Sequence, residues 1–217
     1  MIRLIASFAL LSLVAMPALS QTQPAIPPAP AAAPPLAPPQ AGIVRVVLNT
    51  SLGPVTIDLE KEKAPITTAN FLRYVDQKRL DGTSFYRAVK VASDPPLGLV
   101  QAGTKGDPKR SLPPIAHEAT SKTGLSHLDG TISMARGAPG TASGDFFITI
   151  GALPSFDADP SQPGDNLGFA AFGHVVEGMD VVRRILDAPT SPTEGEGVMK
   201  GQMIAQPVRI LSARRTD

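Results

Sequence analysis

The stretch DGTISMARGAPGTASGDFFITIG, residues 129–151, decides the fold that we expect for this chain. Residues 131–136 and 145–150 have the β-branched and aromatic bias of strands, whereas glycine, proline and small polar residues dominate the segment between them. The stretch therefore predicts two strands joined by a loop of small residues.

Alternation along the second strand assigns its side chains to two faces. Successive side chains point to opposite sides, so Phe146 shares one face with the isoleucines that follow it, and Phe147 shares the other with Thr149 and Gly151. We expect the first face to pack in the hydrophobic core. The second, one ring among small or polar neighbours, is typical of a shallow binding platform; the alternative is an aromatic residue packed beneath a loop.

Composition limits the classes of function. The chain has 217 residues, enough for one domain with extensions, and contains no cysteine, which excludes disulfides, a thiol nucleophile and a cysteine metal site. Its formal net charge is +1, and Arg3 is the only charged residue before position 43. A nucleic-acid-binding protein is expected to be more basic, so we expect no nucleic-acid partner.

Residues 1–20 have the pattern of a secretory signal peptide. Arg3 precedes an apolar run over residues 4–16, and small residues stand at Ala18 and Ser20. A membrane anchor is the alternative, but the apolar run is shorter than the ~20 residues that span a bilayer. We expect cleavage, a periplasmic or secreted location, and no membrane attachment afterwards.

Residues 21–42 consist mainly of proline and alanine and carry no charge. This composition predicts a disordered or extended, semi-rigid linker. A ligand for a proline-recognising partner, or a substrate of a proline-acting enzyme, are the functional alternatives.

A folded domain is predicted over residues 43–217. Strand patterns open it as a hairpin and recur as short segments, and apolar spacing predicts helices over 66–77 and 179–186. Many short strands with two helices indicate a closed β-barrel capped by helices. The expected strands cover residues 43–50, 54–60, 84–89, 97–103, 131–136, 145–150, 170–176 and 207–214.

Four segments resemble one known family. SMARGAPGTASGDFFI at 133–148 resembles the central signature of the cyclophilin-type peptidyl-prolyl cis-trans isomerases, and FYRAV at 85–89, LVQAG at 99–103 and FGHVVEGMDVV at 172–182 resemble further family segments in the family's order. The resemblance, which extends to bacterial exported members, implies an antiparallel eight-stranded β-barrel with a helix at each end. It also implies cofactor-independent isomerisation of X-Pro bonds.

The resemblance assigns roles to particular residues. It makes Arg87 the catalytic residue, although an arginine in a strand, considered alone, is more often a surface or ion-paired residue. It also implies a substrate-binding site with an aromatic floor and apolar walls for the proline ring, and with an amide and a backbone segment that hold the substrate chain. The residues implied for this site are Phe147, Leu99, Ala135, Gln101, Arg136 and Phe169. For Gln101 a merely solvated amide is the alternative.

The sequence departs from the family at three positions. Gly98 stands where many relatives have a pocket-lining phenylalanine, which predicts a wider or shallower pocket. Phe169 replaces a histidine, and Phe156 is the candidate for the place of a tryptophan associated with cyclosporin binding, since the chain has no tryptophan. Cyclosporin sensitivity is therefore not expected to follow from the family.

Other chemistries have weaker patterns. Ser126, His127 and Asp129 are too close in sequence for a catalytic triad, so local hydrogen bonding is expected. His117 and Glu118 could form a metal pair, but no third ligand stands at a recognisable spacing, so we expect no metal site.

The leading hypothesis is a monomeric exported prolyl isomerase that acts on proline-containing segments of exported proteins as they fold. The alternative is a non-catalytic chaperone or proline-segment binding module of the same fold, which Gly98 and Phe169 favour. A hydrolase, supported only by scattered polar residues, ranks last.

Overall fold

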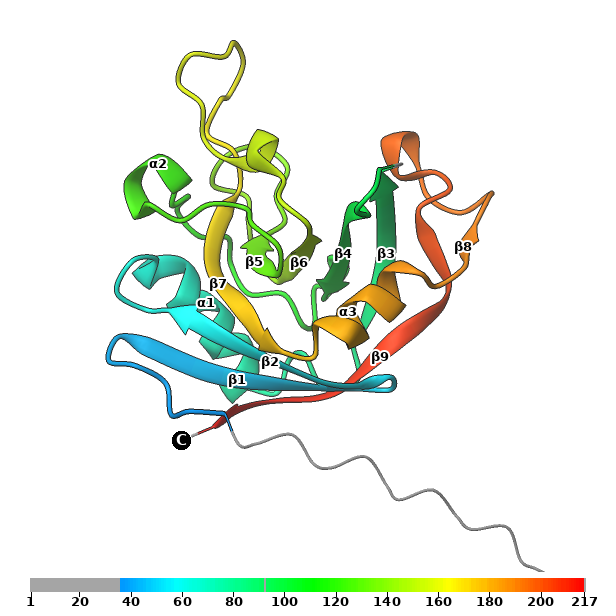
Figure 1. Ribbon diagram of the computed structural model, residues 1–217, viewed down its shortest axis with the longest axis horizontal. Coiled ribbons are helices and arrows are strands. Elements are labelled where there is room, and N and C mark those ends of the chain that lie inside the picture. The colour runs from blue at the N-terminus through cyan, green and yellow to red at the C-terminus, as the bar shows by residue number, and fades with distance from the viewer. Residues whose placement is uncertain (1–35, 92, 217) are drawn as a thin grey trace, which may run out of the picture. The chain divides into compact units, whose positions relative to one another are not determined.

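The computed structural model of the chain describes residues 36–91 and 93–216 (Figure 1). Residues from Pro38 onward belong to one compact unit, and the first strand begins at Ile43. The predicted signal peptide and most of the predicted linker lie outside the described residues. Within the described part of the chain, no helix is long and apolar enough to cross a membrane.

Antiparallel strands close into a barrel. The order is β1-β2-β7-β5-β6-β4-β3-β9, and β9 pairs back with β1, so the described residues form an eight-stranded closed barrel to which the short β8 adds at β9. This confirms the predicted fold. The strands are β1 Ile43–Thr50, β2 Gly53–Glu60, β3 Ser84–Val91, β4 Leu97–Gly103, β5 Thr131–Met134, β6 Asp145–Ile150, β7 Ala170–Glu177, β8 Thr190–Ser191 and β9 Met203–Thr216.

Two helices cover the barrel, as predicted. Helix α1, Pro65–Asp76, packs against β9, β2 and β7, and α3, Met179–Leu186, packs against β2, β3, β4 and β6. Proline at the first position suits the start of α1, and the Glu118 carboxylate accepts hydrogen bonds from the free amides of Ile66 and Thr67 there. A single helical turn, α2, Thr120–Thr123, was not predicted.

Aromatic side chains fill the barrel. Phe146 lies edge-on to Phe71, with ring centroids 5.3 Å apart, and to Phe85 at 6.0 Å. Phe71 also contacts Phe172 at 5.3 Å. Because side chains occupy the interior of so small a barrel, a substrate must bind on its outside.

Strand β9 begins at Met203, four residues before the predicted start at Pro207. Residues on β9 between Met203 and Val208 have no partner in the ladder with β3, where the register shifts. Proline lacks an amide hydrogen, and Pro207 falls in this interruption, which is where a strand tolerates it. The early start matters because Gln202, just before β9, reaches the candidate site.

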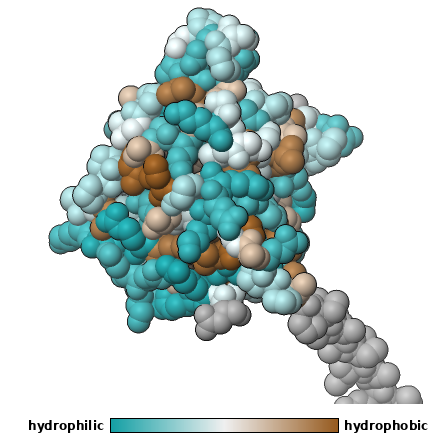
Figure 2. Space-filling view, turned by 90° about the vertical axis from the view of Figure 1, so that its left-hand side faces the viewer, coloured by the Kyte–Doolittle hydropathy of each residue, from teal (hydrophilic) through white to brown (hydrophobic). Residues whose placement is uncertain are grey.

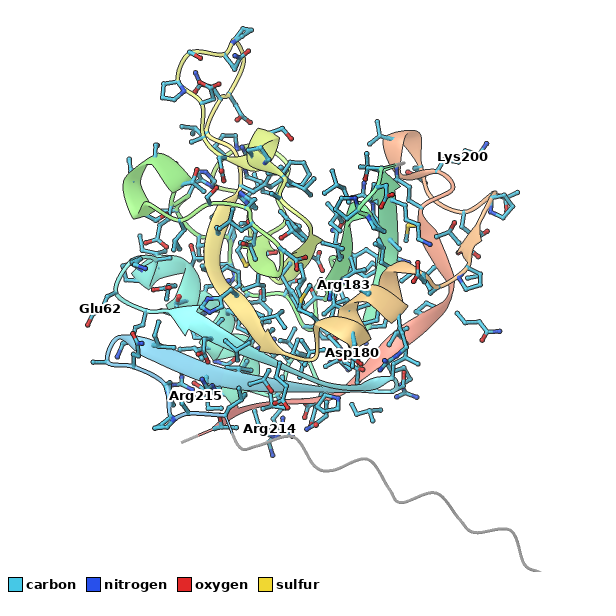
Figure 3. The ribbon with its side chains drawn as sticks, viewed as in Figure 1. Glu62, Asp180, Arg183, Lys200, Arg214 and Arg215 are labelled. Carbon is cyan, nitrogen blue, oxygen red and sulfur yellow. The ribbon has the colours of Figure 1, made fainter. Side chains whose placement is uncertain are left out.

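Hydrophilic side chains cover most of the surface that Figure 2 shows. One face is mainly hydrophilic with small separate apolar patches (Figure 2), as is usual for a protein surface. Ion pairs lie along β9, where Arg214 contacts Asp81 and Arg215 contacts Asp76, and along α3, from which Asp180 and Arg183 project (Figure 3).

Candidate active site

Three neighbouring strands bring the predicted residues to one outer face. In the sheet register Gln101 on β4 lies opposite Arg87 on β3 and opposite Phe147 on β6. Alternation along β4 turns Leu99 to the same side as Gln101. The strand pairing therefore places a cation, an amide and an aromatic ring in one row across the barrel wall.

A β-bulge in β3 shapes this row. Phe85 pairs with Ala102 and Arg87 pairs with Gln101, so Tyr86 is the extra residue that the partner strand does not match. A bulge redirects side chains, and here Phe85 remains in the core while the Tyr86 hydroxyl reaches the side chain of Gln101 on the outside. The bulge thus supplies a second polar group beside Arg87.

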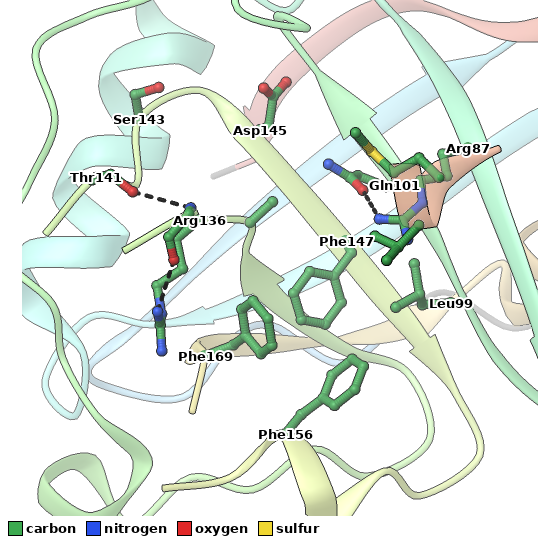
Figure 4. Close-up of a pocket in the computed structure, with 14 residues that line it drawn as sticks. Arg87, Leu99, Gln101, Arg136, Thr141, Ser143, Asp145, Phe147, Phe156 and Phe169 are labelled. Atoms are coloured by element: carbon green, nitrogen blue, oxygen red, sulfur yellow. Dashed lines mark hydrogen bonds between the residues drawn. The ribbon is translucent and has the colours of Figure 1, made fainter. Parts of the chain in front are cut away.

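Two glutamine side chains fix the Arg87 guanidinium. Its Nη1 donates to Gln101 Oε1 at 2.8 Å (Figure 4), while Nε and Nη2 both donate to Gln202 Oε1 at 2.9 and 2.6 Å. Gln101 Nε2 donates in turn to the Tyr86 hydroxyl at 2.7 Å, which keeps Oε1 directed at Arg87. The arginine is therefore oriented before any ligand binds.

The charge of Arg87 is not neutralised by these partners, because both acceptors are amides. Burial lowers the pKa of Arg87 from its ordinary value, and a guanidinium still keeps its proton at neutral pH. Burial also raises the pKa of the Tyr86 phenol strongly, so this group stays protonated. The row consequently presents one positive charge held by neutral groups.

Three phenylalanine rings form an aromatic cage beside Arg87, defined by Phe147, Phe156 and Phe169. The Phe147 ring lies 5.6 Å from Phe156 and 5.3 Å from Phe169, perpendicular to both, and the last two are 5.2 Å apart. Figure 4 shows the rings turned toward one another with Leu99 close by. Phe147 is only 3 % exposed, so it is the floor of a pocket and not the shallow platform that alternation suggested.

Arg136 holds one wall of the cage. Its guanidinium donates to the carbonyl oxygen of Gly168 from Nε at 2.9 Å and from Nη2 at 2.5 Å, and pairs with Asp165 at 2.8 Å. The Arg136 guanidinium holds the pKa of Asp165 down to about 2. The same guanidinium lies over the Phe169 ring. Arg136 therefore ties the loop before β7 to the pocket.

A buried hydrogen-bonded layer supports Phe147 from below. The His127 ring stacks on the Phe147 ring, with centroids 5.9 Å apart. Its Nε2 is hydrogen-bonded to Ser133 Oγ at 2.9 Å, and its Nδ1 is hydrogen-bonded to an oxygen of the Asp157 carboxylate at 2.5 Å. Ser126 also bonds Asp157. His127 and Ser133 are fully buried, so this Ser-His-Asp chain cannot meet a substrate, which argues against the hydrolase.

The cage and Arg87 open onto one cavity of about 520 Å³. All seven residues assigned from the sequence line it, so the fold brings the whole set together. The lining comprises Arg87, Leu99, Gln101, Ala135, Arg136, Gly137, Thr141, Ser143, Asp145, Phe147, Phe156, Phe169, Val198 and Met199.

The model of the family "Cyclophilin type peptidyl-prolyl cis-trans isomerase/CLD" matches residues 45–215, which include every strand of the barrel that lines this cavity. The chain belongs to the cyclophilin family. It is therefore a peptidyl-prolyl cis-trans isomerase by family, and it shares this with curated bacterial relatives.

Two of these relatives are similar over most of their length. A peptidyl-prolyl cis-trans isomerase of Acinetobacter baylyi is 36% identical over 173 residues, covering 78% of this chain and 84% of that protein. The enzyme cyp18 of Streptomyces antibioticus is also 36% identical, over 78% of this chain and 96% of its own. A crystal structure of a cyclophilin-type isomerase from Cryptosporidium parvum has the same fold, with a TM-score of 0.63 at 19% identity, over 81% of this chain and 98% of that one.

One expectation about this cyclophilin was wrong. Gly98 does not line the cavity: on β4 it faces away from Leu99, and a Cβ there would lie 2.2 Å from the carbonyl oxygen of Val89 and 3.1 Å from Leu186. Glycine at this position allows the close approach of β3 and α3. It therefore does not widen the pocket, and it no longer favours a non-catalytic module.

Sequence reasoning missed several parts of the site. Gln202 and Met199 come from the segment before β9, to which the sequence assigned neither structure nor role, and Asp157 joins His127 across 30 positions. Asp129, which the sequence grouped with His127, instead pairs with Arg183. His117 bonds the carbonyl of Leu167 while Glu118 caps α1, so these neighbours have separate partners. Local pattern gives no signal for such long-range pairs.

Proposed function

We propose that this cyclophilin accelerates rotation about X-Pro bonds in exported polypeptides while they fold outside the cytoplasm, with Arg87 as its catalytic residue. The cage of Phe147, Phe156 and Phe169 receives the proline ring. The adjoining backbone of Arg136 hydrogen-bonds the substrate chain, and the remaining amide hydrogen of Gln101 anchors it.

The chemistry requires neither a nucleophile nor a cofactor. Conjugation gives the peptide bond a barrier of about 18–20 kcal/mol, and twisting the bond breaks this conjugation and returns a lone pair to the prolyl nitrogen. A donor aimed at that nitrogen binds the twisted state more strongly than the planar one, and this difference is what accelerates a reaction. Arg87 is such a donor because its guanidinium is rigid and charged.

The proposal rests on one observation: a half-buried arginine whose side-chain partners are neutral amides lies on the same cavity as a cage of three phenylalanine rings. A carboxylate partner would have neutralised the charge of the Arg87 guanidinium and weakened its hydrogen bond to the prolyl nitrogen. A Cryptosporidium parvum cyclophilin of this fold was solved in the presence of the dipeptide Ala-Pro, with a TM-score of 0.62. An Ala-Pro ligand is of the chemical kind that the cage would accept here.

The cellular setting rests on the first forty residues of the sequence. The signal-peptide pattern of residues 1–20 and the uncharged proline- and alanine-rich segment after it support export and a tethered or freely moving domain. Client proteins would then be exported chains with slow X-Pro bonds, which isomerise in about 10–100 s without a catalyst.

The function can be tested by refolding a substrate protein. Its slow refolding phase must be limited by cis-trans isomerisation of X-Pro bonds. We expect the purified protein to shorten this phase at concentrations far below that of the substrate. A binding module would act only near stoichiometric amounts and would slow refolding by holding the chain. Exchange of a short X-Ala-Pro peptide, followed by NMR, measures turnover without any chaperone effect.

A further inference from the structure

Gln202 makes a contact with Arg87 that the family motifs do not contain. It comes just before β9, and its backbone carbonyl accepts a hydrogen bond from the amide of Ala88 on β3 at 2.9 Å. This backbone bond holds the residue across from Arg87. Its side-chain Oε1 then accepts from both Nε and Nη2 of Arg87, at 2.9 and 2.6 Å.

The contact with Gln202 uses two of the hydrogen-bond donors of the Arg87 guanidinium. A guanidinium carries five N–H groups in a fixed plane, and three of them are taken, two by Gln202 and one by Gln101. Among the described residues, the remaining N–H of Nη1 and of Nη2 have no acceptor. Gln202 occupies the edge that contains Nε and one hydrogen of Nη2, so the second hydrogen of Nη2 lies on the far edge of the guanidinium, beside Nη1.

The two glutamines act on different edges and are fixed by different means. Gln101 is set by its bond to the Tyr86 hydroxyl, whereas Gln202 is set by the backbone bond to Ala88. One acceptor alone would let the guanidinium rotate about its Nη1 contact. Two acceptors on separate edges leave a single orientation for the plane.

We propose that Gln202 is a positioning residue for the isomerase reaction: it holds the guanidinium of Arg87 so that the unused N–H groups point at the prolyl nitrogen. This inference rests on the proposed function of Arg87. Glutamine suits the task because it accepts two hydrogen bonds at one oxygen without a charge. A carboxylate in place of Gln202 would neutralise the positive charge of the Arg87 guanidinium. An apolar residue would leave the guanidinium free to change its orientation.

The first test compares Gln202→Leu with Gln206→Leu in peptide exchange. Gln206 is an exposed glutamine on β9, four residues after Gln202 and outside the cavity, and serves as the matched control. We expect Gln202→Leu to lower kcat roughly tenfold with KM nearly unchanged, because the orientation of the donor matters mainly in the transition state. Damage to the neighbouring Met199 wall would instead raise KM. Gln202→Ala is the second variant should leucine prevent folding.

A double-mutant cycle separates positioning through Arg87 from any independent effect. In an Arg87→Ala background the Gln202→Leu change should have almost no further effect on kcat, because the group that it positions is gone. The proton NMR signal of Arg87 Nε–H gives a direct readout: held by Gln202, it should exchange slowly with solvent, and in Gln202→Leu it should exchange fast.

The outcomes distinguish this inference from the proposed function. If the wild type is active, Arg87→Ala is inactive and Gln202→Leu keeps full kcat, the positioning role is wrong while the function stands. Equal losses from Gln202→Leu with and without Arg87 would also overturn it. If Arg87→Ala remains fully active, the proposed mechanism fails first, and the role of Gln202 fails with it.

Discussion

The guanidinium carbon of Arg136 lies 5.3 Å from the centroid of the Phe169 ring, and the same guanidinium bonds the carbonyl oxygen of Gly168. One side chain thus fixes both a ring of the aromatic cage and the backbone that carries it. Since the ring belongs to a loop between η1, Pro154–Phe156, and β7, the shape of the pocket depends on this attachment.

Replacing Arg136 by alanine should therefore weaken substrate binding more than catalysis. We expect KM in peptide exchange to rise roughly threefold to tenfold, or about 0.6–1.4 kcal/mol of binding free energy, because the change removes the support of the pocket wall, while kcat changes little. Arg184→Ala is the matched control, because Arg184 forms an exposed ion pair with Asp180 on α3 and such pairs contribute little. A fall in kcat with unchanged KM would contradict the assigned role.

The adjacent residues Phe146 and Phe147 should separate stability from binding. Phe146 is fully buried within the barrel, so Phe146→Ala should cost about 3–5 kcal/mol of the free energy of unfolding. Phe147→Ala should cost less, because its ring borders a cavity that water can enter, but should largely abolish peptide binding. Urea unfolding and peptide titration measure the two effects. The reverse order of stability losses would show that the two faces are misassigned.

Alternation and turn residues were enough to predict the barrel and the two faces of β6, because these features depend on neighbours in sequence. The extra length of β9 was missed, since Pro207 marks an interruption of the ladder and not the start of the strand. The Arg87–Gln202 contact spans 115 positions, and only the closing of the barrel creates it. The Gly98 error came from alignment to relatives, although alternation along β4 already places Gly98 on the face opposite Leu99 and Gln101.

Burial of His127 predicts a stability that depends on pH. Desolvation lowers the pKa of His127, against the opposing effect of Asp157, so the folded protein binds this proton less readily than the unfolded chain. The unfolded chain takes up the proton below its ordinary pKa of ~6.5. The contribution of His127 to the free energy of unfolding is therefore fully present above that pH. It declines as the pH falls toward the lower pKa that His127 has in the folded protein.

His127→Gln should remove that part of the pH dependence, although it lowers stability at neutral pH by loss of the stack on Phe147. The measurement is the free energy of unfolding in urea at several pH values between neutral and mildly acidic. His174→Gln, at an exposed position on β7, is the control for general acid effects. An unchanged slope in His127→Gln would exclude His127 as its source.

Export should remove about the first twenty residues. The pattern that ends at Ser20 predicts cleavage there, so the intact mass of protein recovered from outside the cytoplasm should lack Met1 and Arg3. A recovered chain that retains Arg3 would contradict the cleavage, and absence of the protein from the fraction outside the cytoplasm would contradict the proposed location.

Arg87→Ala should abolish most of the isomerase activity and leave the fold intact. The twisted prolyl nitrogen needs a donor, and the guanidinium of Arg87, held at two edges by amides beside the aromatic cage, is placed to provide it. Removal of one preorganised donor in a known oxyanion site costs ~10²–10³ in rate, about 2.7–4 kcal/mol, and we expect a loss of that order here.

Arg87→Lys should recover little of this loss, because an ammonium group has no planar fork with which to bond both glutamines and the substrate at once. Peptide exchange and proline-limited refolding of the wild type and both variants measure the effect, with circular dichroism as the control for folding. Arg209→Ala, at an exposed arginine of β9, controls for the loss of a positive charge. A folded Arg87→Ala variant with unchanged turnover would remove Arg87 from the mechanism, since a transition-state donor cannot be lost without a change in kcat.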